Sequence, residues 1–336
     1  MSIPPILLVE DLHVMFNLAG GAVHPVRGVS FELRPGETLG VAGESGSGKS
    51  LSLMAVLGLL PRHATREAAT IRYGDQDLIR TNAREMRKIM ATGIATIFQD
   101  PMTSLNPVLS IGSLLEEVYL CHLGGTRVAA RERAEEMLER VQIPNASSRL
   151  NQFPHELSGG QRQRVMIAMA LMCNPKILIA DEPTTALDVT VQAGILDLLE
   201  QLQQDLGLAV VLVSHDLGVI SRLSHRVAVM YCGQVIETGP AKTVLKDPHH
   251  PYTRALMQCI PGLRNGRRSA RLSPIPGQVP VMSGDLTGCQ FRDRCSFTQA
   301  MCSERDPSPR QAGTGWTYRC HFNPADRLDS RKGVPA

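Results

Sequence analysis

Short apolar segments alternate with amphipathic stripes through the first 240 residues of the chain. Each apolar run is four to six residues long and is bounded by polar or turn residues, which is typical of strands buried on both faces. Buried strands that alternate with helices predict a parallel α/β core. The expected core strands are 38–42, 94–98, 176–180, 208–213, 227–231 and 234–237.

Apolar residues spaced by three and four predict the helices of this core. A helix is expected over 51–60, and a stripe from Val191 to Leu206 ends at Gly207, a residue that commonly closes helices. Two further stripes, within 111–119 and 127–141, predict an all-helical insert between about residues 101 and 163. Ser113 and Glu116 have the spacing of a capping box for the first of these helices.

The two ends of the chain show other patterns. Residues 6–16 and 29–33 read as half-buried strands, and the turn residues 34–37 follow, so an antiparallel patch precedes the core. After about residue 239 the periodicity fades, while Pro, Gly, Arg and Ser become frequent. We therefore predict one domain over 1–240 and an irregular extension over 241–336.

Composition is consistent with a cytosolic globular protein. Hydrophobic residues make up 43% of the 336 residues, which suffice for two domains. No apolar run reaches the length of a membrane span, and the N-terminus lacks the basic start of a signal peptide. A disulfide framework is not expected for the eight cysteines in that compartment. The net charge of +3 gives no argument for nucleic acid, although residues 261–336 carry 12 basic against 6 acidic side chains.

One segment between a predicted strand and a predicted helix has the pattern G-x-x-x-x-G-K-[ST]. Its glycines let successive backbone N–H groups turn toward an anion, and the following helix favours phosphate at its N-terminus. The lysine supplies a positive charge for the outer phosphates, and the serine offers a hydroxyl to Mg²⁺. The segment consists of Gly43, Glu44, Ser45, Gly46, Ser47, Gly48, Lys49 and Ser50.

A second short segment precedes another predicted helix and again places small residues where an anion could bind. It lies 24 residues before the pair Asp181-Glu182, which ends a predicted strand. The segment consists of Leu157, Ser158, Gly159, Gly160 and Gln161.

These motifs, in this order, resemble the ATP-binding-cassette (ABC) ATPases over residues 6 to about 240. The resemblance implies a P-loop NTPase fold: a RecA-like parallel sheet, an antiparallel β subdomain and a helical subdomain. It further implies that Lys49 contacts the β- and γ-phosphates and that Glu182 is the general base for the attacking water. The implied Mg²⁺ ligands are Ser50, Gln99 and Asp181. Gln99 would also sense the γ-phosphate and the membrane partner.

The resemblance assigns four further features. His215 would be the switch histidine on the γ-phosphate, and Phe16 would stack on adenine, where the family often has Tyr. Residues 186–188 resemble the loop that crosses between two cassettes, with Asp188 as its acidic residue. Residues 157–161 resemble the signature that closes over the nucleotide of a partner cassette. Taken singly, each residue has an ordinary explanation as a strand end, a cap or a satisfied core amide, so the assignment depends on their order and spacing.

Three longer segments narrow the resemblance. Residues 98–107, 181–190 and 247–253 are similar to the ATPases of dipeptide, oligopeptide and nickel importers, and the loop region looks most like the D-type dipeptide subunit. This resemblance implies a peripheral protein on the cytoplasmic face of the inner membrane. Its implied partners are a second, homologous ATPase, two transmembrane permease subunits and an extracytoplasmic peptide-binding protein. The permease is expected to dock around residues 99–106.

Other functions are compatible with parts of the pattern. The same machinery could import nickel, glutathione or another small solute, and the sequence does not name the cargo. A soluble cassette ATPase of DNA repair or translation would usually carry a long coiled-coil insert or two cassettes, and this chain shows neither. An inactive regulatory cassette is disfavoured because Lys49, Glu182 and His215 are all present.

Four cysteines cluster near the C-terminus: Cys289, Cys295, Cys302 and Cys320. Their spacing, C-x5-C-x6-C-x17-C, lacks the C-x2-C pairs of common zinc sites. Four thiols in a cytosolic segment with little core still suggest a soft metal centre. Spacing alone leaves iron–sulfur, zinc and free thiols open, and the family resemblance favours a 4Fe-4S cluster over zinc.

Overall fold

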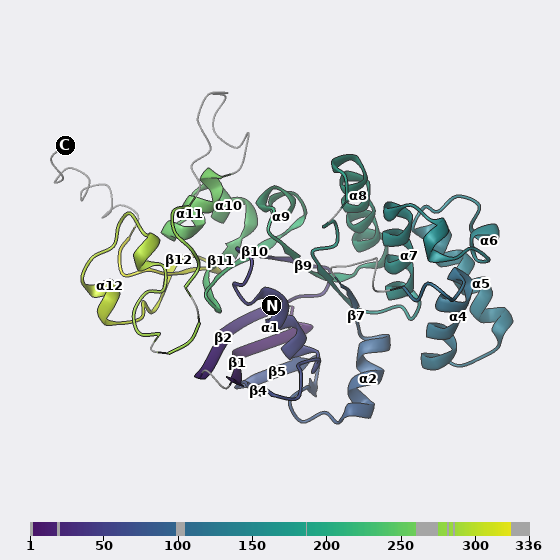
Figure 1. Cartoon of the computed structure of the whole chain (residues 1–336), viewed down its shortest axis with the longest axis horizontal. Helices are drawn as coiled ribbons and strands as arrows, with labels where there is room; N and C mark the ends of the chain where they lie inside the picture. The colour runs from purple at the N-terminus through teal and green to yellow at the C-terminus, as the bar shows by residue number, and fades with distance from the viewer. Residues whose placement is uncertain are drawn as a thin grey trace. The chain divides into compact units, whose positions relative to one another are not determined.

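The computed structural model describes residues 3–18, 21–98, 105–185, 187–259, 275–280, 282–284 and 286–323, and its contacts divide the chain into two compact units. Unit 1 comprises residues 1–6, 33–38 and 80–213, and unit 2 comprises residues 7–32, 39–79 and 214–336. Both units contain strands and helices (Figure 1).

Unit 2 begins with an antiparallel sheet. Its strand order is β2-β1-β5-β6, and β4 also pairs with β1. Leu7, Val9, Leu12 and Val14 of β1 are fully buried, so one face of the sheet forms a core. This sheet confirms the predicted antiparallel patch. The strands are β1 (Leu7–Leu18), β2 (Gly21–Leu33), β4 (Ala64–Glu67), β5 (Thr70–Tyr73) and β6 (Gln76–Asp77).

The rest of unit 2 is built on β3 (Thr38–Ala42), which pairs in parallel with β10 (Arg226–Tyr231). β10 pairs antiparallel with β11 (Gln234–Pro240). The helices of this unit are α1 (Lys49–Val56), α9 (Leu217–Leu223), α10 (Ala241–Lys246) and α11 (Pro251–Gln258).

The C-terminal extension is more regular than the sequence suggested. β13 (Trp316–Arg319) pairs with β11, and β12 (Pro309–Gly313) pairs with β13, so the extension adds two strands to the sheet of unit 2. In Figure 1 the yellow segment with β12 and α12 (Met301–Glu304) lies beside the green β11. The segment also contains the short helix η2 (Arg292–Arg294). Within the described part of the extension, the fading periodicity therefore marked short elements.

A buried carboxylate ties the extension to β11. Glu237 is 1% exposed and accepts hydrogen bonds from the His249 N–H (2.8 Å), the His250 N–H (3.0 Å) and the Trp316 indole N–H (3.1 Å). Burial raises the pKa of Glu237, while these donors act in the opposite direction. The segment 247–253 thus has a structural task in this chain, in which two backbone N–H groups satisfy a buried acid.

The described residues of unit 1 form three parallel strands, of which β8 pairs with both β7 and β9. β9 is buried along its whole length, as its continuous apolar run predicts. The strands are β7 (Ile94–Ile97), β8 (Ile177–Asp181) and β9 (Ala209–Ser214). These strands, together with β3 and β10, confirm the predicted parallel α/β core.

The described residues of unit 1 also form helices. They are α2 (Ala83–Thr92), α4 (Ile111–His122), α5 (Arg127–Arg140), α6 (Ala146–Arg149), η1 (Pro154–Glu156), α7 (Gly159–Leu171) and α8 (Val189–Leu206). The predicted capping box at Ser113 is wrong. Ser110 caps α4 by accepting a hydrogen bond from the Ser113 N–H at 3.3 Å, and Glu116 pairs with Arg131 of α5. The cap lies three residues earlier because the helix begins at Ile111.

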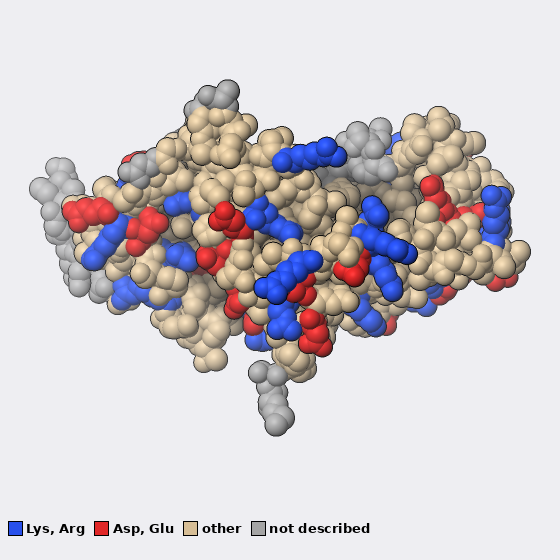
Figure 2. Space-filling model, turned by 90° about the horizontal axis from the view of Figure 1, so that it is seen from below, with Lys and Arg blue, Asp and Glu red and all other residues tan. Residues whose placement is uncertain are grey.

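The surface carries both signs of charge. Figure 2 shows basic and acidic side chains interspersed over the face in view. None of the helices in the described ranges is long and apolar enough to cross a bilayer.

Candidate nucleotide site

Residues 43–50 connect β3 to α1 in unit 2, in the predicted order of strand, loop and helix. Gly43 and Gly48 have φ angles of 153° and 97°. A Cβ at Gly43 would lie 2.4 Å from the Met230 carbonyl oxygen, and one at Gly48 would lie 2.5 Å from the Pro25 carbonyl oxygen. The curl of the loop therefore requires glycine at both positions.

Two polar side chains lie inside this loop. Lys49 is buried, with 5% of its surface exposed. Its ammonium group donates to the carbonyl oxygens of Gly43 (2.8 Å) and Glu44 (3.0 Å). The Ser47 hydroxyl is buried and makes no hydrogen bond within the described residues. A loop with glycine at the tightly packed positions, an orphaned hydroxyl and a lysine together fit a phosphate group.

Phe16, the predicted adenine contact, lies on β1 and is partly exposed. Its ring is tilted against His63, with centroids 5.5 Å apart. The sequence reading missed His63, because an isolated histidine in a turn-rich stretch gives no signal.

His215 follows β9 and is exposed at the start of α9. The residues on either side hold its backbone. The Asp216 N–H donates to the Ser214 hydroxyl (3.0 Å), and Asp216 caps α9 by accepting from the Gly218 N–H (2.7 Å). These hydrogen bonds hold the backbone of the turn that carries the His215 imidazole.

In unit 1, Asp181 ends β8 and Glu182 follows it with φ at 47°, the left-handed region that non-glycine residues seldom adopt. The Glu182 N–H donates to the Val213 carbonyl (3.0 Å), and its carboxylate accepts from the Thr185 hydroxyl (2.9 Å). Backbone strain of this kind often occurs at functional sites.

The segment 157–161 forms the start of α7. Ser158 and Gln161 make a reciprocal capping box, with the Gln161 N–H donating to the Ser158 hydroxyl and the Ser158 N–H donating to the Gln161 amide oxygen. A Cβ at Gly160 would lie 2.5 Å from the Val191 Cγ1, so this glycine lets α7 approach α8 closely. The sequence predicted only an anion-binding role for these residues. It did not indicate the helix cap or the close approach of α7 to α8.

Two predicted features touch residues that the structure does not describe. Gln99 lies outside the described residues, as does Ala186 of the predicted crossing loop. Asp188 is described, and it caps α8 by accepting from the Thr190 and Val191 N–H groups. The predicted Mg²⁺ ligands therefore stay a prediction.

The sequence reading also missed the contacts of Glu44 with the C-terminal part of unit 2. Its backbone N–H donates to the Tyr252 hydroxyl, and its carboxylate pairs with Arg294. Tyr252 belongs to a segment that the sequence reading had singled out, but no local pattern marks Arg294.

The four C-terminal cysteines lie near one another. Burial and, to a smaller extent, the three other thiols raise the pKa of the Cys289 thiol to about 12. The Phe297 N–H donates to the Cys295 sulfur at 3.4 Å. However, the described residues contain no group of three or more His, Cys, Asp or Glu side chains arranged to hold a metal ion. The thiols are thus close enough to influence one another's ionisation without forming a ligand set, and the expected metal centre is not supported.

Comparisons with known proteins agree with this geometry. Residues 26–185 match the ABC transporter family. The chain is 45% identical to a dipeptide transport ATP-binding protein of Bacillus subtilis over 94% of both chains. It belongs to the ABC transporter ATPases. Residues 236–302 also match the oligopeptide/dipeptide transporter C-terminal region, so this ABC ATPase resembles its relatives beyond the cassette.

The ABC ATPase is also similar to a second bacterial protein and to two solved structures. It is 47% identical to a Brucella abortus protein whose name includes the words peptide import ATP-binding protein, over 94% of both chains. An ATP-binding cassette solved as a dimer with ADP and Pi is 28% identical, with a TM-score of 0.60, over 70% of this chain and 99% of the other. A Clostridium perfringens protein described as part of an ABC transporter complex is 29% identical, with a TM-score of 0.63, over 72% and 91%.

Proposed function

We propose that this chain is the ATP-binding and ATP-hydrolysing subunit that powers a peptide importer. The observation that carries the proposal is identity of 45% to a dipeptide transport protein across 94% of both chains, which includes most of the extension as well as the cassette. The match of residues 236–302 to the oligopeptide/dipeptide transporter C-terminal region supports peptides over other solutes. Nickel chelates, glutathione and other small solutes are the alternative cargo.

In this function residues 43–50 hold the phosphates of ATP. Lys49 would leave the carbonyl oxygens of Gly43 and Glu44 and pair with the outer phosphates, to which a cation binds more strongly. Ser50, Asp181 and Gln99 would hold Mg²⁺, which would supply positive charge beside the transferred phosphoryl group. The Ser47 hydroxyl, which lacks a partner among the described residues, is a further donor for this site.

Glu182 would accept the proton of the attacking water. Its backbone is fixed by Val213 and its carboxylate by Thr185, so the acid is already oriented. His215 would hydrogen bond to the γ-phosphate from the turn before α9. Phe16 would stack on the adenine base, which its partial exposure permits.

The nucleotide site would be completed by a second cassette. The N-terminus of α7, with the Gly159 and Gly160 amides, offers donors for a phosphate bound by the partner. The related cassette that was solved as a dimer with ADP and Pi supports an arrangement of this kind. We favour a homologous, non-identical partner because that is what the family resemblance implies.

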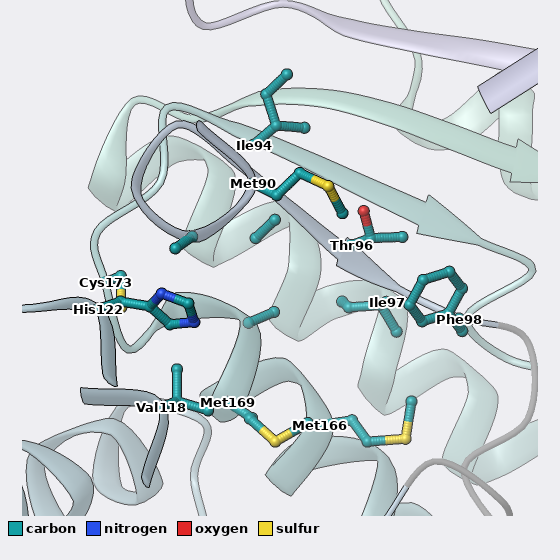
Figure 3. Close-up of a pocket in the computed structure, with 13 residues that line it drawn as sticks. Met90, Ile94, Thr96, Ile97, Phe98, Val118, His122, Met166, Met169 and Cys173 are labelled. Carbon is teal, nitrogen blue, oxygen red and sulfur yellow. The ribbon is translucent and has the colours of Figure 1, made fainter. Parts of the chain in front are cut away.

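A groove in unit 1 is the proposed docking site for a permease (Figure 3). Its volume is about 460 Å³, and its walls come from α2, β7, α4 and α7. The lining is largely apolar, and Met90, Met166 and Met169 give it side chains that adapt to a partner. Phe98 is 45% exposed at the groove and immediately precedes the predicted docking segment 99–106. The proposed occupant is a short cytoplasmic segment of a transmembrane permease, which would place this chain on the cytoplasmic face of the inner membrane.

The proposal is tested by co-purifying the chain with the proposed permease, second ATPase and peptide-binding protein. Peptide-loaded binding protein should raise ATP turnover of the reconstituted transporter several-fold, and nickel or glutathione should not. Lys49→Ala should remove ATP binding and with it all stimulated turnover. If only a metal chelate or glutathione stimulates, the alternative cargo replaces peptides.

We also propose that the four C-terminal cysteines take up a 4Fe-4S cluster, with zinc as the alternative. An all-thiol donor set and an N–H···S hydrogen bond at Cys295 fit such a cluster, and the resemblance to peptide importers favours it. The described side chains are not preformed as ligands, so uptake would have to draw the thiols together.

Protein purified without oxygen should therefore be brown and contain about four irons per chain. Cys302→Ser should lose the colour and most of the iron, while Cys173→Ser, which alters a buried cysteine in unit 1, should keep both. A colourless protein that contains zinc alone would reverse the assignment, and one without metal would remove it.

A further inference from the structure

Glu44 is held by residues that follow it by more than 200 positions in the chain. Its carboxylate receives two hydrogen bonds from Arg294, from Nη1 to Oε2 (2.7 Å) and from Nη2 to Oε1 (3.0 Å). Its backbone N–H donates to the Tyr252 hydroxyl (2.9 Å). Both partners come from the part of unit 2 that follows the cassette. The second residue of the phosphate-binding loop is thus fixed through both its side chain and its backbone.

The Arg294 side chain is itself fixed. It is 4% exposed, its Nε donates to the Pro276 carbonyl (2.9 Å), and Nη1 also lies 3.4 Å from the Tyr231 hydroxyl. A paired guanidinium and carboxylate in this two-bond geometry are strongly oriented, which a lysine could not reproduce. The guanidinium of an arginine is charged at every physiological pH, and the pairing with Glu44 raises the pKa of Arg294 further.

The contacts reach the nucleotide site through the backbone of Glu44. Its N–H points to Tyr252, and its carbonyl oxygen accepts from Lys49 at 3.0 Å. The Ser47 N–H donates to the same carbonyl at 3.2 Å. A change in the position of Glu44 would therefore move the lysine and the serine that are proposed to meet the phosphates.

We propose that Arg294 is a positioning residue for nucleotide binding, which acts through Glu44 to hold the loop in the shape that accepts ATP. The C-terminal extension then sets the affinity of the cassette for its nucleotide. This inference rests on the proposed assignment of residues 43–50 to ATP.

The test measures ATP affinity of the full-length chain by equilibrium titration. Arg294→Met keeps the apolar stem of the side chain and removes the ion pair, and it should weaken ATP binding about tenfold. Glu44→Gln, at a partly exposed position, should weaken it less. The double variant should bind no more weakly than Arg294→Met alone, because both changes break one interaction. Arg294→Lys should restore part of the affinity.

Arg27→Met is the matched control. Arg27 is also a buried arginine of unit 2, and it contacts the extension through the Leu286 carbonyl and Asp306 without touching residues 43–50 in any described contact. It should lower the thermal unfolding midpoint as Arg294→Met does, yet leave ATP affinity within about twofold. If Arg294→Met fails to fold, the ATP affinity of Glu44→Gln is the test: weaker binding supports the inference, and wild-type binding contradicts it.

Wild-type affinity in folded Arg294→Met would overturn the inference, as would additive effects in the double variant. Lys49→Ala separates this inference from the assignment of the site. If Lys49→Ala loses ATP while Arg294→Met does not, only the role of Arg294 is refuted. If Lys49→Ala also binds ATP normally, the site assignment fails and this inference fails with it.

Discussion

Glu182 is held in a conformation that few non-glycine residues adopt. Its φ of 47° costs roughly 1–2 kcal/mol relative to an ordinary backbone, so the surrounding structure must over-determine it. The Val213 carbonyl and the Thr185 hydroxyl provide that restraint. A carboxylate that is fixed before substrate arrives loses little freedom when it orients a water, which is the property a general base needs.

Glu182→Gln should therefore strongly reduce ATP hydrolysis, and the variant should still bind ATP. The amide oxygen can still accept from Thr185, so the backbone and the fold should persist, while the group no longer takes up a proton. We expect the turnover of the reconstituted transporter to fall about 10²- to 10⁴-fold, with ATP affinity unchanged or tighter. Rapid filtration with labelled ATP measures both quantities. Asp205→Asn, at an exposed carboxylate on α8, serves as the control. Normal turnover in Glu182→Gln would remove it as the base.

At this scale the sequence predicted the residues whose chemistry is local. Gly43, Gly48 and Lys49 were recognisable because their spacing alone shapes an anion cradle. Arg294 was not, since its partner is 250 residues away and an arginine between two cysteines has no special pattern. The capping role of Ser158 was hidden for another reason: a serine before a helix fits both a cap and an anion site.

At the scale of elements, strands buried on both faces were the most predictable. β3 covers 38–42 and β10 covers 226–231, which agrees with their apolar runs to within one residue. β12 and β13 were both missed. For β12 the reason is that an exposed strand alternates only weakly, and this one contains Pro and Gly. The groove beside Phe98 was also beyond the sequence, because its walls come from four elements that are separated along the chain.

The groove yields a prediction at this scale. Ala170→Phe should fill part of it and should lower peptide-stimulated turnover of the transporter about tenfold, since a filled pocket cannot seat a partner side chain. Val128→Phe, at a 68% exposed position of α5, adds a similar ring to a surface outside the groove and should behave as wild type. ATP affinity of the isolated chain should be unchanged in both. Full stimulation in Ala170→Phe would mean that the permease docks elsewhere.

For the whole molecule, the division into units does not follow the predicted division into domains. Unit 2 combines the phosphate-binding loop with residues 214–336, whereas the sequence placed a boundary near residue 240. That boundary stays a prediction, and the contacts describe a different grouping. The composition of the sequence changes there. However, the sequence could not show that β11 pairs with a strand of the extension, or that the Glu237 carboxylate accepts a hydrogen bond from the Trp316 indole.

The pairing of β11 with β13 also fixes an order of events during synthesis. About 75 residues separate the two strands, and a ribosome that adds roughly 5–20 residues per second needs roughly 4–15 seconds to make them. Until β13 has been made, the edge of β11 that pairs with β13 in the finished sheet lacks that partner. A nascent chain released in this window would keep the edge open to strands of other chains. The tendency of such fragments to aggregate is thus set by where translation stops, even though every residue of the phosphate-binding loop has already been made.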